Sequence, residues 1–388
     1  MGELQTERER RVTPLELFFD LVFVFGFTQV TTVLSNDPTW RGLDHGVLIL
    51  VALWWAWSAY AWLTNTVDSE EGAVWGSILV AIGAMFIASL AVPEAFGSHG
   101  VVFGVAFLIV IVMQVTLYAL AARGEKDLLA AILRFAPSTL AGAIFILVAG
   151  FVPTDIRPLL WLAGLAVALL VPLLGSLQGW RVNTAHFVER HGLIVIIAIG
   201  ESLAAIGFGA RGTGLTAGVI VAAVLGFVVA ASFWLAYFDF FTRRAEQLLT
   251  DRSGVQQIAL ARDTYTYLHL PMVAGIVLFA FAMKETLAHV SSVLDTVPAI
   301  CLAGGSALYL LAFTALRWRI SHSVRGGRSI AALACVLLIP LAMTVPAIAA
   351  LAALAGVWIT LHAYELIWWR AERAEVREQR LPASASWR

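Results

Sequence analysis

Long apolar runs separated by short polar segments recur along nearly the whole chain. A bilayer crossing needs about 20 apolar residues in a helix, and about twelve runs approach that length. The last two come from one stretch, residues 329–369, which Pro340 and Pro346 interrupt, so we expect two helices joined by a tight turn. The pattern predicts an all-α polytopic transmembrane bundle with runs centred near Val24, Leu53, Gly83, Ile109, Gly142, Ala166, Ile199, Gly226, Ile276, Ser306, Leu338 and Ala355.

The basic residues are distributed unevenly between the two sides that such a bundle would have. If the first of twelve helices starts inside, all but four of the 25 Lys and Arg residues fall in inner segments, and the exceptions are Arg41, Arg157, Arg211 and Lys284. Because Lys and Arg collect in cytoplasmic loops, both termini are expected in the cytoplasm. The first fourteen residues are polar and lead directly into a full-length span, which predicts an uncleaved signal anchor.

Composition excludes an ordinary soluble enzyme, because 60% of the residues are apolar and only 13% are charged, against about 25% charged in an average soluble domain. Cys301 and Cys335 lie in apolar runs, where core packing is expected rather than a disulfide or thiolate metal site. The spacing of His186, Glu189 and His191 matches no zinc motif, and neither a phosphate loop nor a Ser-His-Asp arrangement is evident. We therefore expect no metal and no cofactor.

The partners that the sequence predicts are the lipid bilayer and a small solute or ion of unknown identity. Basic residues lie beside the spans, which suits anionic lipid rather than nucleic acid. The longest inner loop, Thr242 to Thr264, is expected to be a short charged linker. Nothing in the sequence indicates the oligomeric state.

Weak internal similarity predicts two parallel six-span repeats, residues 1–178 and 179–370, followed by a charged cytoplasmic tail, 371–388. Aligning the first span with the seventh sets Gln29 opposite Glu201, and residues 57–60 then pair with 234–237 in the next spans. Sites in such proteins tend to lie between the repeats, near the middle of the membrane.

Two spans contain carboxylates in apolar surroundings. A charge at the centre of a membrane helix costs about 2.5–3.5 kcal/mol on insertion scales, so such residues usually face a cavity or a partner and indicate a functional site. Glu201 is the deepest, about 12 Å along its helix from Leu193. His186 and Arg190 fall on the same helix face as Glu201 and are expected to line its inner approach, whereas Glu189 points to another side.

The role of these carboxylates is open at this point. Glu201 suits a proton- or ion-coupling site, a static hydrogen bond or ion pair between helices, or a catalytic group. Glu16 and Asp20 are one turn apart and share a face, where they could collect a cation. Alternatively, Glu16 sits in a water-exposed first turn and Asp20 pairs with an arginine of another helix. Gln29 faces away from Asp20, so two separate environments are expected.

Aromatic and polar residues of the second, eighth and ninth spans are candidates for a vestibule that walls a substrate path. Belts at the membrane interface and simple packing are the alternative interpretation. The residues concerned are Trp57, Tyr60, Trp234, Tyr237, Asp239 and His269.

Two motifs taken together resemble the low temperature requirement A family of bacterial membrane proteins. The first runs from Glu16 to Phe25, and the second comprises residues 186–193 with Gly200-Glu201-Ser202. The resemblance implies a multi-pass bacterial inner-membrane protein, linked by name to growth in the cold, with no established catalytic mechanism. It marks as signature positions Glu16, Asp20, His186, Glu189, Arg190 and Glu201.

These observations favour a secondary transporter or ion-coupled permeation protein that uses buried carboxylates. Two other classes stay open, namely an intramembrane enzyme acting on lipid or quinone and a membrane sensor or scaffold that transports nothing. Among the three, an enzyme is not favoured, because no catalytic constellation accompanies the carboxylates.

Overall fold

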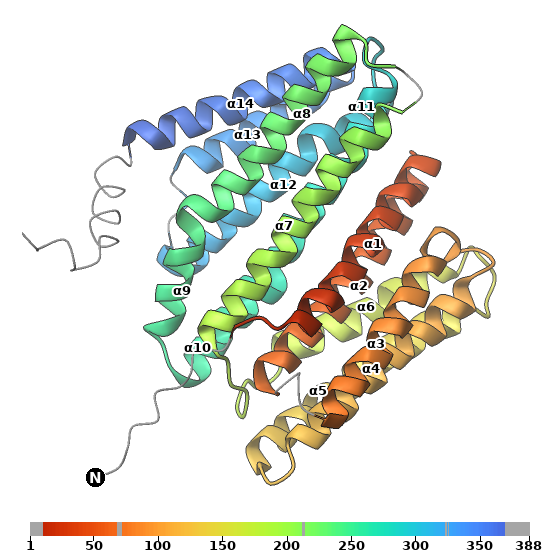
Figure 1. Cartoon of the computed structure of the whole chain (residues 1–388), viewed down its shortest axis with the longest axis vertical. Coiled ribbons are helices and arrows are strands. Elements are labelled where there is room, and N and C mark those ends of the chain that lie inside the picture. Colours follow the sequence, from red (N-terminus) through yellow and green to blue (C-terminus); the bar gives the residue numbers. More distant parts are fainter. Residues whose placement is uncertain (1–10, 68–71, 212–213, 323, 325, 369–388) are drawn as a thin grey trace, which may run out of the picture.

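The chain is an all-α bundle of membrane-spanning helices (Figure 1). The computed structural model describes residues 11–67, 72–211, 214–322, 324 and 326–368, so the predicted tail, 371–388, lies outside the described residues. The first six long helices are α1 (Pro14–Asn36), α2 (Trp40–Thr66), α3 (Gly72–Ala91), α4 (Gly100–Ala121), α5 (Lys126–Ala149) and α6 (Arg157–Leu174), with a 3₁₀ turn, η1 (Val92–Glu94), after α3. The remaining elements are α7 (Thr184–Gly209), α8 (Ala217–Ala236), η2 (Tyr237–Phe241), α9 (Thr242–Thr250), α10 (Gly254–Ala261), η3 (Arg262–Leu268), α11 (His269–Ala288), α12 (Thr296–Ser321), α13 (Gly327–Ala342) and α14 (Ala347–Trp368).

Hydropathy located the spans well. In the part of the chain that the structure describes, eleven helices are long and apolar enough to cross a membrane, and α13 is a shorter apolar helix of 16 residues. The expected turn between the last two helices is present, since α13 ends at Ala342 and α14 begins directly after Pro346. Large apolar side chains on the outside of the bundle, such as Leu133, Leu159 and Leu337, are about two-thirds exposed and form the surface that lipid would cover.

The segment expected to be a charged linker is helical instead. Residues 242–261 form α9 and α10, and the π-helical segment η3 joins α10 to α11. Leu249, Ile258 and Leu260 are buried there against the bundle, whereas Gln247 and Gln256 are exposed.

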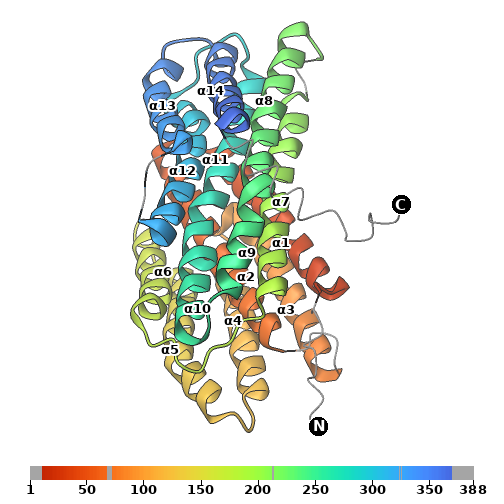
Figure 2. The same cartoon turned by 90° about the vertical axis from the view of Figure 1, so that its left-hand side faces the viewer.

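The helices form two groups that meet along α1 and α7. Figure 1 shows these two helices side by side in the middle, with α2–α6 on one side and α8 and α11–α14 on the other. The turned view in Figure 2 shows α4 and α5 at one end and α13 and α14 at the other. Both α1 and α2 contact α7 and α11, so α1 and α2 lie at the junction of the two groups.

One very close helix contact holds the second group together. α11 and α12 approach each other at Gly275 and Gly305, where a Cβ atom on Gly305 would lie 2.6 Å from the carbonyl oxygen of Gly275. Only glycine fits at this distance, because a Cβ atom there would collide with the opposite backbone.

Candidate functional site

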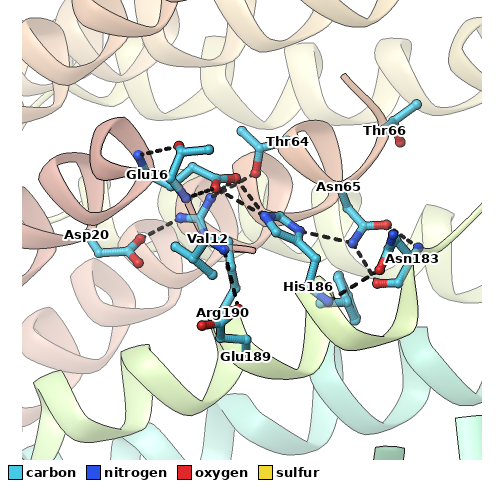
Figure 3. A network of polar contacts seen from close by, with 12 residues as sticks. Val12, Glu16, Asp20, Thr64, Asn65, Thr66, Asn183, His186, Glu189 and Arg190 are labelled. Carbon is cyan, nitrogen blue, oxygen red and sulfur yellow. Dashed lines mark hydrogen bonds and ion pairs between the residues drawn. The ribbon is translucent and has the colours of Figure 1, made fainter. Parts of the chain in front are cut away.

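The first polar site lies where α1 and α7 begin, and we call Glu16, Asp20, His186 and Arg190 the Arg190 cluster (Figure 3). Arg190 is completely buried. Its Nη2 lies 2.5 Å from Oδ1 of Asp20, and its Nη1 lies 3.3 Å from Oε1 of Glu16 and donates to the Thr64 hydroxyl at 2.8 Å. Trp57 donates its indole N–H to the same Asp20 oxygen at 2.8 Å. The cluster thus ties together α1, α2 and α7.

Helix geometry explains why four distant residues meet. Glu16 and Asp20 are one turn apart on α1, and His186 and Arg190 are one turn apart on α7, so each pair presents its side chains from one face. Glu16 also caps the N-terminus of α1, because its carboxylate accepts a hydrogen bond from the backbone N–H of Thr13 at 2.9 Å in a capping box. Glu16 is 1% exposed and so does not sit in a water-exposed first turn.

The hydrogen bonds around His186 assign its tautomer. Asn65 accepts the backbone N–H of Asn183 at 2.6 Å and donates to the Asn183 carbonyl at 2.9 Å, which fixes the orientation of its amide. The amide nitrogen therefore faces Nδ1 of His186, 3.2 Å away, and that ring nitrogen acts as the acceptor. The proton belongs to Nε2, which lies 3.1 Å from the Glu16 carboxylate. In this arrangement His186 is neutral.

The charges of the Arg190 cluster do not cancel. With His186 neutral, one guanidinium stands between two carboxylates, so the cluster holds one excess negative charge when both carboxylates are ionised. Oδ2 of Asp20 and Nε of Arg190 are buried and have no hydrogen-bond partner among the residues that the structure describes. Such a group is costly to bury, and removing the guanidinium would leave both carboxylates uncompensated.

A second polar site, the Glu201 cluster, lies further along the same two helices and comprises Glu201, Thr28, Thr31 and Lys284. Glu201 is 1% exposed and accepts hydrogen bonds from Thr28 at 2.5 Å and from Thr31 at 2.6 Å. Lys284 of α11 donates to the Thr31 hydroxyl at 2.6 Å, and its Nζ lies 3.9 Å from Oε1 of Glu201. The Thr31 hydroxyl therefore stands between a buried carboxylate and an ammonium group.

The Glu201 cluster borders a cavity of about 400 Å³ at this end of the bundle, where α1, α7 and α11 end. Thr28 and Lys284 belong to both the cluster and the cavity wall, and Arg211 and Glu285 add further charges. Thr32 and Ser35 continue the row of hydroxyl groups along α1. The lining thus combines three charged side chains and a row of hydroxyl groups with apolar surface.

Apolar side chains separate the two clusters. Phe23 and Phe27 of α1 and Ile194 and Ala198 of α7 lie between them along the helices and are fully buried. His191, next to Arg190, packs instead among aromatic rings, with its ring centroid 4.9 Å from that of Trp57. The clusters are therefore two separate environments on one pair of helices.

Comparison with known proteins decides the family. Residues 11–363 match the family described as bacterial low temperature requirement A protein (LtrA). The chain belongs to the LtrA family. An uncharacterised protein of Rhizobium meliloti (strain 1021) is 31% identical over 308 residues, which cover 76% of this chain and 74% of the relative. No solved structure matches the chain significantly.

The LtrA signature residues fall at both clusters. Glu16, Asp20, His186 and Arg190 form the first and Glu201 belongs to the second. Arg190 and His186 do not line an approach to Glu201, because α1 brings its own carboxylates level with them. Two further predicted residues stand apart. Glu189 is exposed and accepts the backbone N–H of Val12 at 3.3 Å, and Gln29 is half-buried and makes no hydrogen bond to a described residue.

The six residues expected to form a vestibule do not line the cavity beside the Glu201 cluster. Trp57 belongs to the Arg190 cluster, and Tyr60 donates to the carbonyl of Val110 at 3.0 Å inside the first helix group. Tyr237 and His269 are hydrogen-bonded to each other at 2.9 Å in the interior of this LtrA chain, while Trp234 and Asp239 are exposed. These residues therefore occupy packing and surface positions rather than the wall of one substrate path.

Several site residues were not singled out from the sequence. Thr28 and Thr31 gave a weak signal, since hydroxyl groups are common in apolar helices, and Lys284 was counted only as an outer charge. Thr64 and Asn65 close the Arg190 cluster from α2. In the part of this LtrA chain that the structure describes, no three His, Cys, Asp or Glu side chains are placed to hold a metal ion.

Proposed function

We propose that the protein is a secondary transporter or ion-coupled permeation protein, with Glu201 as its coupling carboxylate. The observation that carries the proposal is a fully buried carboxylate connected through one hydroxyl group to Lys284, which lines a cavity of about 400 Å³. Ionisable groups inside membrane spans are expensive and usually belong to ion or substrate pathways. A static interhelical bond alone would need no adjoining cavity.

The geometry suggests how binding of a proton and binding of a solute are linked. When Glu201 is ionised, it compensates the charge of Lys284 across 3.9 Å. When Glu201 takes up a proton, Lys284 and Arg211 face the cavity with only Glu285 as counter-charge, so an anionic solute gains affinity. Each ligand then favours the other, which is the reciprocal relation that coupled transport requires.

The Arg190 cluster is the closed end of the proposed path. It joins α1, α2 and α7 on the far side of the apolar layer formed by Phe23, Phe27, Ile194 and Ala198. Exchange between the two ends would require these buried ion pairs to separate. In this role the ion pairs of Arg190 hold α1, α2 and α7 together, while Glu201 binds and releases the proton.

The order of helix packing supports two parallel six-span repeats. In the first group α3 packs on α1, α4 on α3, α5 on α4 and α6 on α5, and α2 contacts α6. The second group repeats this order with α11 on α7, α12 on α11, α13 on α12 and α14 on α13, while α8 contacts α14. Both clusters then lie between the repeats, as in other transporters with internal symmetry.

The distribution of Lys and Arg supports a cytoplasmic position for both termini. Arg211 and Lys284, two of the four basic residues outside the inner segments, line the cavity. The cavity would accordingly open to the outside of the bacterial cytoplasmic membrane, and the Arg190 cluster would lie toward the cytoplasm.

Proteoliposomes test the coupling role. We would load a pH-sensitive dye, impose a proton gradient and hold the voltage with valinomycin and potassium. Wild type should show proton flux that Glu201→Gln loses by at least tenfold. Glu189→Gln is the matched control, because Glu189 is an exposed carboxylate on the same helix, and it should keep wild-type flux. Measurable flux that is equal in wild type and Glu201→Gln would contradict the coupling role of Glu201, and the absence of flux in both would exclude proton passage without the solute.

A further inference from the structure

A second cavity, of about 130 Å³, lies away from both clusters between α2, α4 and α5. Two of the side chains that line it, Gln114 and Tyr118, are one turn apart on α4 and are completely buried. Neither amide atom of Gln114 has a hydrogen-bond partner within the described residues, nor does the Tyr118 hydroxyl. These three unpartnered polar atoms belong to residues that line the cavity, and a ligand that reached them when the side chains turn toward it would supply the missing bonds.

Other polar groups around this cavity are satisfied, which sets Gln114 and Tyr118 apart. The indole N–H of Trp55 donates to Thr139 at 3.0 Å, and that of Trp62 donates to Thr266 at 2.8 Å. The indole N–H groups in the cavity wall therefore have hydrogen-bond partners. The amide of Gln114 and the hydroxyl of Tyr118 have none within the described residues. Leaving a buried polar atom without a hydrogen bond is costly, so a partner there contributes strongly.

Aromatic rings form much of the rest of the wall, which also includes aliphatic side chains and the two arginines Arg134 and Arg262. Trp180 is surrounded by Tyr118, Phe135 and Trp62, with ring centroids 5.4, 5.7 and 6.1 Å away, and all four side chains line the cavity. Aromatic walls suit a flat ring, because aromatic side chains stack favourably on the faces of nucleic-acid bases. The size agrees, because a cavity of about 150 Å³ holds benzene.

The amide of Gln114 specifies the edge of such a ring. A carboxamide offers a donor and an acceptor side by side, and it pairs in a bidentate manner with a ring edge that offers the complementary acceptor and donor. We propose that this cavity binds a planar heteroaromatic ring with an adjacent donor and acceptor on one edge, as pyrimidine bases have. Gln114 pairs with that edge, and Tyr118 supplies one further hydrogen bond.

Equilibrium dialysis of the detergent-purified full-length protein tests the site with radiolabelled uracil and cytosine. Both should bind saturably, and 1,3-dimethyluracil, which keeps the ring but lacks N–H donors, should bind at least tenfold more weakly. Gln114→Leu should weaken uracil binding at least tenfold, and Tyr118→Phe should weaken it several-fold. Because the assay needs no flux, its outcome is independent of the proposed transport role.

The control is Ser89→Ala, which removes another buried, unpartnered hydroxyl outside this cavity and should leave binding unchanged. Thermal unfolding shows whether Gln114→Leu is folded, and we expect its unfolding temperature to equal or exceed that of wild type, since an unpartnered amide is removed. The proposal is overturned by the absence of saturable uracil and cytosine binding, by equal binding of 1,3-dimethyluracil, or by wild-type binding in folded Gln114→Leu.

Discussion

The guanidinium group of Arg190 lies 2.5 Å from the carboxylate of Asp20, 170 residues earlier in the chain, and both side chains are inaccessible to solvent. This contact joins the two helix groups at their common seam. A lone buried charge in a membrane helix is costly, so each of the two residues makes the other tolerable there.

Replacing Arg190 should strongly destabilise the protein. Arg190→Gln leaves Glu16 and Asp20 buried without a cation, and removing one member of a buried pair costs about 3–5 kcal/mol. The measurement is unfolding of the detergent-solubilised protein, followed by tryptophan fluorescence. The double variant Asp20→Asn/Arg190→Gln should recover part of the loss, because one uncompensated charge disappears with it.

The exposed pair Arg181–Glu125, with side chains 77% and 45% exposed, gives a matched comparison. Arg181→Gln should cost no more than about 1 kcal/mol, since exposed ion pairs contribute little. If both arginine variants lost the same stability, burial of the Arg190 cluster would not be the cause.

Thr31 and Thr32 are adjacent, but only the Thr31 hydroxyl lies between two charged groups, so variants of the two residues can be compared. Thr31→Val removes the group between Glu201 and Lys284 and should cost about 1.5–3 kcal/mol, the range for hydrogen bonds to charged groups. Thr32→Val removes only a bond to the Thr28 carbonyl and should cost about 1 kcal/mol or less. Chemical unfolding of the two variants side by side checks this order, and a larger loss in Thr32→Val would contradict it.

Thiol labelling tests which parts of the α1–α7 seam water reaches. Cys301 and Cys335 are buried, so the wild-type background should be low. A membrane-impermeant maleimide added to intact cells should modify Thr32→Cys in the cavity and spare Ala198→Cys in the apolar layer. Labelling of Thr32→Cys only in inside-out vesicles would reverse the proposed orientation, and equal labelling of both sites would argue against the apolar layer.

The glycine contact between α11 and α12 should tolerate no side chain. Gly305→Ala places a Cβ atom against the backbone of Gly275, and the helices must move apart at a cost of about 1–3 kcal/mol. Gly356→Ala, where a Cβ atom meets nothing within 4 Å, should be neutral or stabilising by up to about 1 kcal/mol. Unfolding temperatures of the two variants decide whether the close contact or mere loss of glycine matters.

Helix positions followed from the sequence because the bilayer fixes the length of a span, and Pro340 and Pro346 marked the final turn. Helix faces were also predictable, and Glu16 shares one with Asp20 as expected. The sequence did not predict which helix would pack against the Glu16–Asp20 face of α1, because α1 and α7 are adjacent only through tertiary packing. His186 and Arg190 share a face with Glu201, but 11 residues correspond to about 16 Å along the helix, so they meet a different partner.

The distance in sequence between the two sides of the Arg190 cluster bears on how the protein is made. Chains emerge from the ribosome at about 5–20 residues per second, so about ten to thirty seconds separate the synthesis of Asp20 from that of Arg190. During this interval the first helix carries two carboxylates whose cation does not yet exist. The first helix to be synthesised therefore gains its cation only after α7, in the middle of the chain, has followed it, and the seam between the two helix groups can close only from that point on.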